Sequence, residues 1–196
     1  MPRTPPAPRV DLDHNATAPL LPAARAAMLA ALDGPARGGN PSSPHAAGHA
    51  ARLVLEGARA EVAALLGARA SDIIFVSGGT EADNLAVAGL WRARAGASPA
   101  GASAARAPSR IVTTSIEHPA VLEPCRRLAQ EEGADLVAVA CRADGSVDAG
   151  EAARALAPGA ALASIMLANN ETGVVQPVHE IAAAAAAAGV PLHTDA

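Results

Sequence analysis

The sequence contains no lysine and no tyrosine, and its only aromatic residues besides histidine are Phe75 and Trp91. All 15 basic residues are therefore arginine. Chemistry that needs a lysine amine, such as Schiff-base formation, cannot be completed within this chain. A formal net charge of −4 and the scarcity of aromatic side chains offer neither a basic surface nor a stacking platform for nucleic acid. We therefore expect no nucleic-acid partner.

Cysteines and long apolar runs are also scarce. The two cysteines, Cys125 and Cys141, fit neither a disulfide framework nor a CxxC metal pattern, which is typical of a reducing compartment. The start of the chain has no apolar segment of the signal-peptide type. The apolar runs near 160–168 and 181–188 are shorter than the ~20 residues that a membrane span needs. These features predict a cytoplasmic protein without a membrane partner.

What is present is an alternation of short apolar segments and longer helical patterns. This pattern predicts an α/β fold, a mostly parallel sheet with helices on both faces. The predicted strands are residues 72–76, 110–114, 135–139, 161–167 and 190–194. The predicted helices are residues 21–32, 45–66, 81–95, 119–132, 148–156 and 178–188.

The domain organisation is expected to be simple. Residues 1–18, which are rich in proline, are predicted to form an amino-terminal arm, and residues 19–196 a single domain. The segment 96–109 is rich in Gly, Ala and Ser and is expected to be a surface insertion. The chain stops directly after the last predicted core strand, without a helix to cover it, so the sequence predicts a truncated domain.

Polar segments follow several of the predicted strands. The first, Ser77-Gly78-Gly79-Thr80-Glu81, suits one phosphate group, because small residues at a helix amino terminus leave backbone N–H groups accessible. A tight turn capped by Thr80 would use the same residues. The second segment places His118 after the strand 110–114, where it could stack on a planar ring or move a proton, or be an exposed residue at a helix start.

Two further segments complete the set. Asn169-Asn170-Glu171-Thr172-Gly173 follows the strand 161–167, although a simple turn would use similar residues. Asp195 closes the last strand, where a buried carboxylate needs a cationic partner. Ligands of parallel sheets bind at the carboxyl ends of the strands. A phosphate cup, a stacking group, an amide and a carboxylate at that edge match the needs of pyridoxal phosphate.

The chain resembles the amino-terminal half of cysteine desulfurases of the NifS/IscS-like group, within the class V aminotransferase family. The resemblance covers nearly the whole chain and is carried by six segments in series: Leu12-Asp13-His14-Asn15-Ala16-Thr17-Ala18-Pro19, Gly39-Asn40-Pro41-Ser42-Ser43-Pro44-His45, Ser77-Gly78-Gly79-Thr80-Glu81-Ala82-Asp83-Asn84, Glu117-His118-Pro119-Ala120-Val121, Asn169-Asn170-Glu171-Thr172-Gly173-Val174-Val175-Gln176 and His193-Thr194-Asp195-Ala196.

The resemblance implies the large domain of a pyridoxal-phosphate-dependent transferase of fold type I, and a role for each site residue. Gly79 and Thr80 would bind the cofactor phosphate, and His118 would stack on the ring and act in proton transfer. Asn170 would hydrogen-bond the phenolic oxygen, and Asp195 would keep the ring nitrogen protonated. The segments around 15–17 and Asn40 would lie near the substrate carboxylate. No metal is implied.

The implied activity is the removal of sulfur from L-cysteine, which gives alanine and an enzyme persulfide for iron–sulfur cluster assembly or tRNA thiolation. In this family a lysine and a loop cysteine later in the chain are needed, and neither is present here. Cys125 and Cys141 are therefore interpreted as structural, and the chain by itself is expected to be inactive. The implied partners are L-cysteine, a sulfur-acceptor or scaffold protein, and a second copy in a homodimer.

Three alternatives stay open from the sequence. The first is another class V enzyme, such as a selenocysteine lyase. The second is a non-catalytic half-protein that binds a partner chain, which the absence of lysine favours. The third is a phosphate-binding α/β module unrelated to pyridoxal phosphate, which requires the match of six segments to be accidental.

Overall fold

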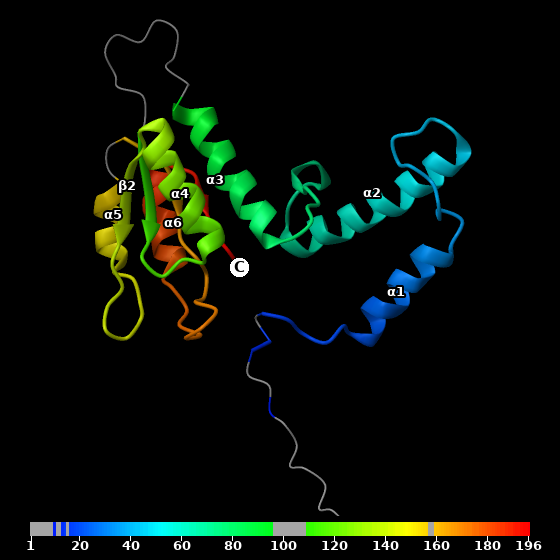
Figure 1. The fold of residues 1–196 in the computed structure, drawn as a ribbon, viewed down its shortest axis with the longest axis horizontal. Coiled ribbons are helices and arrows are strands. Elements are labelled where there is room, and N and C mark those ends of the chain that lie inside the picture. The colour runs from blue at the N-terminus through cyan, green and yellow to red at the C-terminus, as the bar shows by residue number, and fades with distance from the viewer. Residues whose placement is uncertain (1–9, 11–12, 15, 96–108, 157–158) are drawn as a thin grey trace, which may run out of the picture. The chain divides into compact units, whose positions relative to one another are not determined.

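The computed structural model describes residues 10, 13–14, 16–95, 109–156 and 159–196. The chain forms two compact units, Met1–Phe75 and Val76–Ala196 (Figure 1). Most of the predicted arm and residues 96–108 of the predicted insertion lie outside the described residues. The predicted division into an arm of residues 1–18 and a domain of residues 19–196 stays a prediction.

Four parallel strands form the centre of the second unit. They lie in the spatial order β2-β1-β3-β4. Their bounds are β1 Arg110–Thr114, β2 Asp135–Val139, β3 Ala160–Ser164 and β4 Leu192–His193. Val112 of β1 is in register with Val137 of β2 and with Ala163 of β3. The predicted bounds of β1 and β2 are confirmed, whereas β3 and β4 are shorter than predicted.

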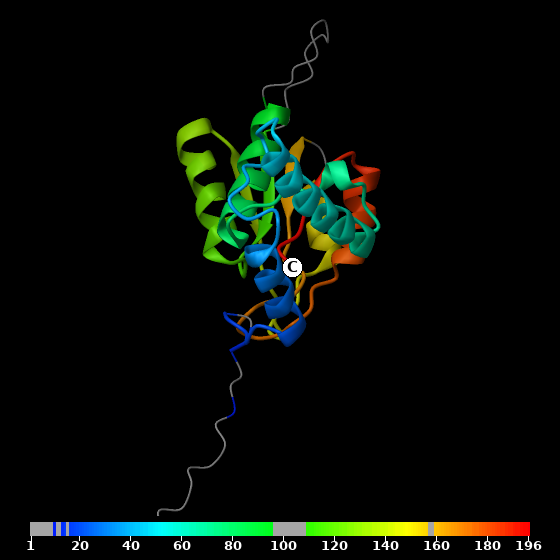
Figure 2. The same cartoon turned by 90° about the vertical axis from the view of Figure 1, so that its right-hand side faces the viewer.

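Helices cover both faces of this sheet. Their bounds are α3 Gly79–Ala95, α4 Pro119–Glu132, α5 Ala149–Leu156 and α6 Val178–Ala187. Ile111 packs in a cluster with α3 and α4, and the next residue, Val112, packs in a second cluster with α5 and α6. Figure 2 shows α4 (yellow-green) and α6 (red) on opposite sides of the strands. The predicted α/β fold is therefore confirmed.

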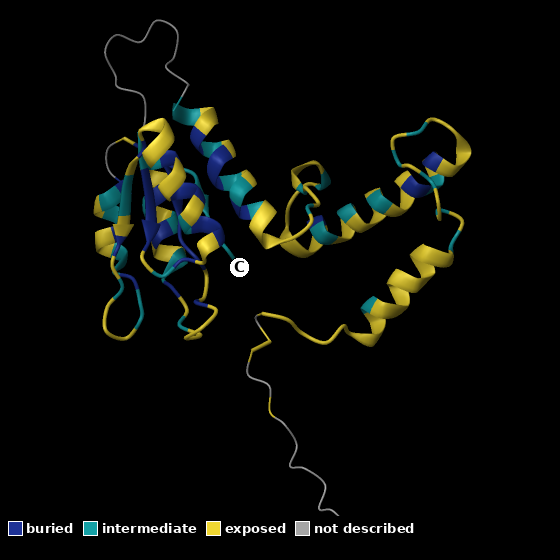
Figure 3. Cartoon of the chain, in the orientation of Figure 1, coloured by how far each residue is buried: buried dark blue, intermediate teal, exposed yellow. Residues whose placement is uncertain are grey.

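The first unit consists of helices with little buried surface. Its elements are α1 Pro22–Asp33, α2 Ala46–Leu66 and a 3-10 turn, η1 Ala70–Asp72. Local signals define α2: the side chain of His45 accepts a hydrogen bond from the Gly48 amide, and Gly67 ends the helix with a φ of 64°. Only Gly48, Ala51 and Ala63 of α2 are buried, and no residue of α1 is (Figure 3).

The predicted strand at residues 72–76 is wrong. Residue 72 ends the turn η1, and residues 73–76 pair with none of the strands in the described part of the chain. Ile74 is 68% exposed and Phe75 is 45% exposed. Contacts within the first unit hold this segment instead, because Arg59 donates a hydrogen bond to the Ile73 carbonyl and lies 5.1 Å from the centre of the Phe75 ring.

Candidate active site

The turn that begins α3 is held by one acidic side chain. The amide and the hydroxyl of Ser77 both donate to Glu81 Oε2, at 2.7 and 2.6 Å, and these bonds lower the pKa of Glu81. The amides of Gly79 and Thr80 belong to the first helical turn, where N–H groups have no partner within the helix. A Cβ built on Gly79 meets no heavy atom within 4 Å, so the space beside this turn is open.

The position of this turn differs from the one that the sequence predicts. The sequence places the segment from Ser77 to Glu81 at the carboxyl end of a sheet strand. Because residues 73–76 pair with none of the described strands, the turn is positioned by α3 instead. The packing of Val87 and Trp91 against the sheet holds α3 in place.

His118 lies between β1 and α4 and serves as the amino-terminal cap of α4. Its Nδ1 accepts a hydrogen bond from the Ala120 amide at 3.1 Å, which fixes the ring at the start of the helix. The side chain is exposed. Pro119 at the first helical position and Gly133 at the end, with a φ of 73°, define the bounds of α4.

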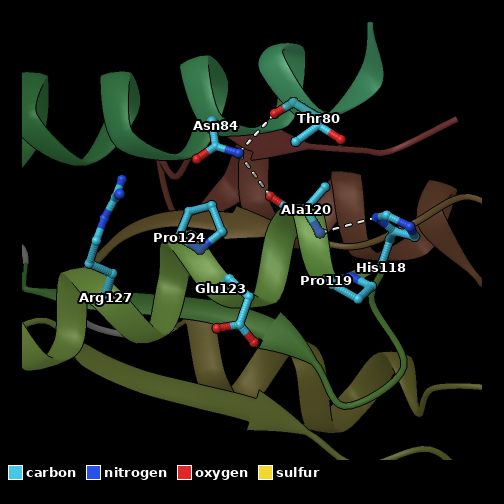
Figure 4. A pocket seen from close by; sticks show the side chains of 8 residues that line it. All are labelled: Thr80, Asn84, His118, Pro119, Ala120, Glu123, Pro124 and Arg127. Carbon is cyan, nitrogen blue, oxygen red and sulfur yellow. Dashed lines mark hydrogen bonds between the residues drawn. The ribbon is translucent and has the colours of Figure 1, made fainter.

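Thr80 and His118 line the same pocket. Asn84 joins its two walls, because Nδ2 donates to the Thr80 carbonyl at 2.8 Å and to the Ala120 carbonyl at 3.4 Å (Figure 4). The pocket has a volume of about 460 Å³ and is lined by Thr80, Asn84, His118, Pro119, Ala120, Glu123, Pro124 and Arg127. Gly79 is next to Thr80 in the chain, whereas Asn170 and Asp195 are not among the lining residues.

Two adjacent asparagines follow β3 and differ in their surroundings. Asn169 is buried, and its Oδ1 accepts hydrogen bonds from the amides of Glu171 and Thr172 at 3.1 and 2.9 Å. Its Nδ2 donates to the Ile116 carbonyl at 3.0 Å. The side-chain amide of Asn169 therefore stabilises the turn after β3, as expected for a residue of a simple turn. Asn170 is exposed beside it.

Asp195 is half-buried beyond the end of β4. Its backbone carbonyl accepts a hydrogen bond from the Leu167 amide at 2.9 Å, which continues the pairing of β4 with the chain after β3. The charge of Asp195 raises the pKa of both Asp83 and Glu117. These carboxyl groups therefore lie within electrostatic range of one another.

Glu117 is a buried carboxyl group at the end of β1. Its Oε1 accepts hydrogen bonds from the Thr114 hydroxyl at 2.6 Å and from the Met166 amide at 2.9 Å. Its Oε2 is buried and has no hydrogen-bond partner in the described structure. Burial raises the pKa of Glu117 to about 7, and the charges of Asp195 and Asp83 act in the same direction. The hydrogen-bonded oxygen connects the ends of β1 and β3.

Three further residues near the site were not predicted from the sequence: Asp83, Glu117 and His193. Asp83 is 4% exposed in α3, and His193 Nε2 lies 3.4 Å from its Oδ1. A signal was available, because all three are titratable residues within the six segments that carry the family resemblance. Their contacts join residues far apart in the sequence, so only the fold brings them together.

The comparisons with known proteins agree with this architecture. Residues 10–196 match the family described as Aminotransferase class-V. The IscS-like cysteine desulfurase of Mycobacterium tuberculosis is 46% identical over 94% of this chain and 45% of its own length. A cysteine desulfurase of Cereibacter sphaeroides is 44% identical over 96% of the chain and 46% of its own length. The selenocysteine lyase of Bos taurus is 35% identical over 96% and 47%.

A comparison with solved structures also shows similarity over most of the chain. The structure described as "SspA in complex with cysteine" superposes with a TM-score of 0.81 at 32% identity, and covers 94% of this chain and 49% of that chain. The chain belongs to the class V aminotransferase family. The predicted resemblance to cysteine desulfurases is confirmed, and the chain spans about half the length of the curated relatives it matches.

Two further properties concern the described residues alone. No helix among them is long and apolar enough to cross a membrane. No group of three or more His, Cys, Asp or Glu side chains in the same part of the chain is arranged to hold a metal ion.

Proposed function

We propose that this protein is part of a pyridoxal-phosphate-dependent cysteine desulfurase, and that its second unit supplies residues that bind the cofactor. The observation that carries the proposal is the pocket in which Thr80 of α3 lies with His118 of α4. This pocket belongs to a fold that cysteine desulfurases share with the chain.

The residues present fit this cofactor. The open space beside Gly79 and the first-turn amides of α3 suit a phosphate group. Asp195, in electrostatic range of two further carboxyl groups, suits a protonated ring nitrogen. His118 would stack on the ring, and Asn170 would hydrogen-bond the phenolic oxygen. When bound, pyridoxal phosphate supplies an electron sink for the α-carbon of an amino acid.

The chain's own residues divide the remaining work. His118 is exposed, and its Nδ1 accepts a hydrogen bond from the Ala120 amide. Its imidazole can therefore move a proton at the substrate or the cofactor ring without disturbing the core. Asp195 would hold a proton on the ring nitrogen of the bound cofactor by charge pairing. The segments around 15–17 and Asn40 would contact the substrate carboxylate.

Neither cysteine of this chain suits the sulfur acceptor. Cys125 is buried in α4, and burial raises the pKa of its thiol to about 12. A thiolate is the nucleophile in sulfur transfer, so such a thiol is unreactive at neutral pH. Cys141 is half-buried and faces Val147 in a two-residue bridge. The acceptor thiol and the lysine that holds the cofactor would come from outside these 196 residues.

The proposed setting follows from the same family. The enzyme would act in the cytoplasm as a homodimer, take L-cysteine as substrate, and pass sulfur to an acceptor or scaffold protein for iron–sulfur cluster assembly or tRNA thiolation. Selenocysteine lyase is the second candidate, because a relative of that name is 35% identical. The higher identity of the cysteine desulfurases favours L-cysteine.

A chimaeric enzyme tests the proposal. Residues 1–196 replace the matching part of the Mycobacterium tuberculosis relative, and alanine formation from L-cysteine is measured with a thiol reductant present. We expect turnover, which Asp195→Ala abolishes. Asp135→Ala, which removes an exposed aspartate of β2, is the matched control and retains turnover. A folded chimaera that binds pyridoxal phosphate but is indifferent to Asp195→Ala contradicts the proposal.

The 196-residue chain alone gives a second measurement. Because it has no lysine, borohydride reduction in the presence of pyridoxal phosphate should label only the terminal amine. We expect the chain to bind the cofactor reversibly and to release no sulfide from L-cysteine above a cofactor-only control. Sulfide release that depends on Asp195 and His118 would show that the lysine is dispensable.

A further inference from the structure

A buried aspartate in α3 contacts a histidine in β4. His193 Nε2 lies 3.4 Å from Asp83 Oδ1, and the two side chains are 14% and 6% exposed. His193 Nδ1 lies 2.8 Å from the hydroxyl oxygen of Ser164, which is its partner in the register of β3 and β4. Both ring nitrogens of His193 are therefore held, one from the helix layer and one from the sheet.

The chain keeps its register with β3 from His193 to Asp195. The Ile165 amide donates to the His193 carbonyl at 3.0 Å, and the Leu167 amide donates to the Asp195 carbonyl at 2.9 Å. Alternate residues of an extended chain place their side chains on the same face. His193 and Asp195 therefore share the face that α3 covers.

Asp83 lies close to Gly79 and Thr80, the residues of the candidate site at the start of α3. It follows Gly79 and Thr80 by three to four residues, which is one turn of α3. The contact between Asp83 and His193 therefore joins the first turn of α3 to the segment that carries Asp195. A buried carboxylate beside a histidine is generally no more stabilising than apolar residues of the same size, so packing alone does not account for this pair.

We propose that Asp83 and His193 are positioning residues, which hold Asp195 at a fixed place relative to the first turn of α3. The inference rests on the proposed function, because the spacing matters when a single ligand contacts both ends. The phosphate of that ligand would lie at Gly79 and Thr80, and its cationic ring at Asp195.

Burial of this pair favours a neutral imidazole in contact with the carboxylate. Burial raises the pKa of Asp83, with Asp195 acting in the same direction and with His193 and His118 opposing it. Burial lowers the pKa of His193, against the charges of Asp83 and Asp195. A neutral His193 with its proton on Nε2 satisfies both neighbours, because Nε2–H then faces Asp83 and Nδ1 accepts the Ser164 hydroxyl proton. The two contacts then fix the orientation of the imidazole ring between α3 and β3.

Amide hydrogen exchange of the 196-residue chain without cofactor tests the positioning. In Asp83→Ala, exchange of the Leu167 amide, whose acceptor is Asp195, should accelerate about tenfold, while exchange of the Val112 amide in β1 stays unchanged. Asp83→Asn retains an oxygen that can accept from Nε2 and should stay within about threefold of the parent. Asp33→Ala, which removes an exposed aspartate at the end of α1, is the matched control and should change neither amide.

Two results overturn the proposal. One is unchanged exchange of the Leu167 amide in Asp83→Ala, and the other is equal acceleration of both amides, which shows a merely structural role. If Asp83→Ala does not fold, Ser164→Ala decides by the same comparison, because it removes the hydroxyl bonded to His193 Nδ1. A selective acceleration of the Leu167 amide in that variant supports the proposal, and its absence overturns it.

A binding measurement separates this inference from the proposed function. The amide shifts of Gly79 and Thr80 are titrated with inorganic phosphate and with pyridoxal phosphate. Asp83→Ala should weaken pyridoxal phosphate binding about tenfold and leave phosphate binding unchanged, because phosphate contacts one end only. If the parent chain does not respond to pyridoxal phosphate, the proposed function fails, while the exchange experiment still decides whether Asp83 fixes Asp195.

Discussion

The two units differ in where their apolar side chains lie. In the second unit, both faces of the sheet are covered, and residues such as Leu162 and Ile165 are fully buried. In the first unit, the larger apolar side chains are on the surface (Figure 3). Apart from Leu85, Leu167 and Val175, every exposed large hydrophobic residue of the described chain lies in the first unit.

This difference shows that the helices of the first unit are specified locally. Proline near the start of α1, the cap of α2 by His45 and the left-handed Gly67 define helix ends without help from a core. Most of the stability of helices in proteins comes from packing of an apolar face rather than from such local signals. Most of the apolar side chains of this unit can be covered only by surfaces that the unit itself does not provide.

The largest expected effect comes from separating the units. A fragment of residues 76–196 should keep its far-ultraviolet circular dichroism and unfold cooperatively, because its two apolar clusters are self-contained. A fragment of residues 1–75 should show weak helicity and no cooperative transition. A sharp thermal transition in the shorter fragment would refute this comparison.

A matched pair of leucine substitutions should differ by several kcal/mol. Leu162→Ala, in the fully buried strand β3, should cost about 2–5 kcal/mol in the free energy of unfolding. Leu65→Ala, at a position that is 84% exposed in α2, should cost less than about 0.5 kcal/mol. Denaturant unfolding of the 196-residue chain measures both, and equal costs would show that the first unit buries Leu65.

The comparison also explains which elements the sequence could predict. The bounds of β1, β2 and α4 are as predicted, because apolar β-branched runs, Pro119 and Gly133 are local signals. The same kind of apolar run at residues 72–76 is no strand, since a strand also requires a neighbour to pair with. Local pattern therefore predicts the second unit better than the end of the first.

The residues of the candidate site also differ in whether local sequence signals could predict them. Thr80 and His118 could be predicted, because small or polar residues at helix starts are visible in the sequence, and they line one pocket. The buried contacts near these residues could not be predicted. The contact of Asp83 with His193 and the hydrogen bond from the Met166 amide to Glu117 join distant parts of the chain. Partners of this kind follow from the packing of α3 on the sheet, which periodicity does not specify.

The pH dependence of stability should identify Glu117 as a buried group of the second unit. Burial raises its pKa from 4.5 to about 7, so the folded state binds the proton more tightly than the unfolded state. The contribution of Glu117 to stability is therefore greatest below pH 4.5 and falls as the pH rises toward 7, by on the order of 3 kcal/mol.

Glu117→Gln should remove this loss, because glutamine keeps an acceptor for Thr114 and Met166 and carries no charge. The measurement is urea unfolding of the parent and the variant at pH 5 and pH 8. The variant should gain stability relative to the parent at the higher pH. An equal pH dependence in both proteins would place the titration elsewhere in the chain.

A smaller effect on stability than that of Glu117 is expected at His118. Its ring caps α4 through the Ala120 amide, so His118→Ala should cost about 1 kcal/mol, whereas His118→Asn should recover most of this because asparagine is a good cap. His179→Ala, which removes an exposed histidine near the start of α6, is the matched control for loss of an imidazole.

The asparagine variant separates the cap from the chemistry. In the chimaeric enzyme, both His118→Ala and His118→Asn should lower alanine formation about 10²-fold, as expected for loss of a general acid–base, although only the first lowers stability. His179→Ala should leave both properties unchanged. If His118→Asn restores activity together with stability, the histidine serves only as a helix cap, and proton transfer must be assigned to another residue of the second unit.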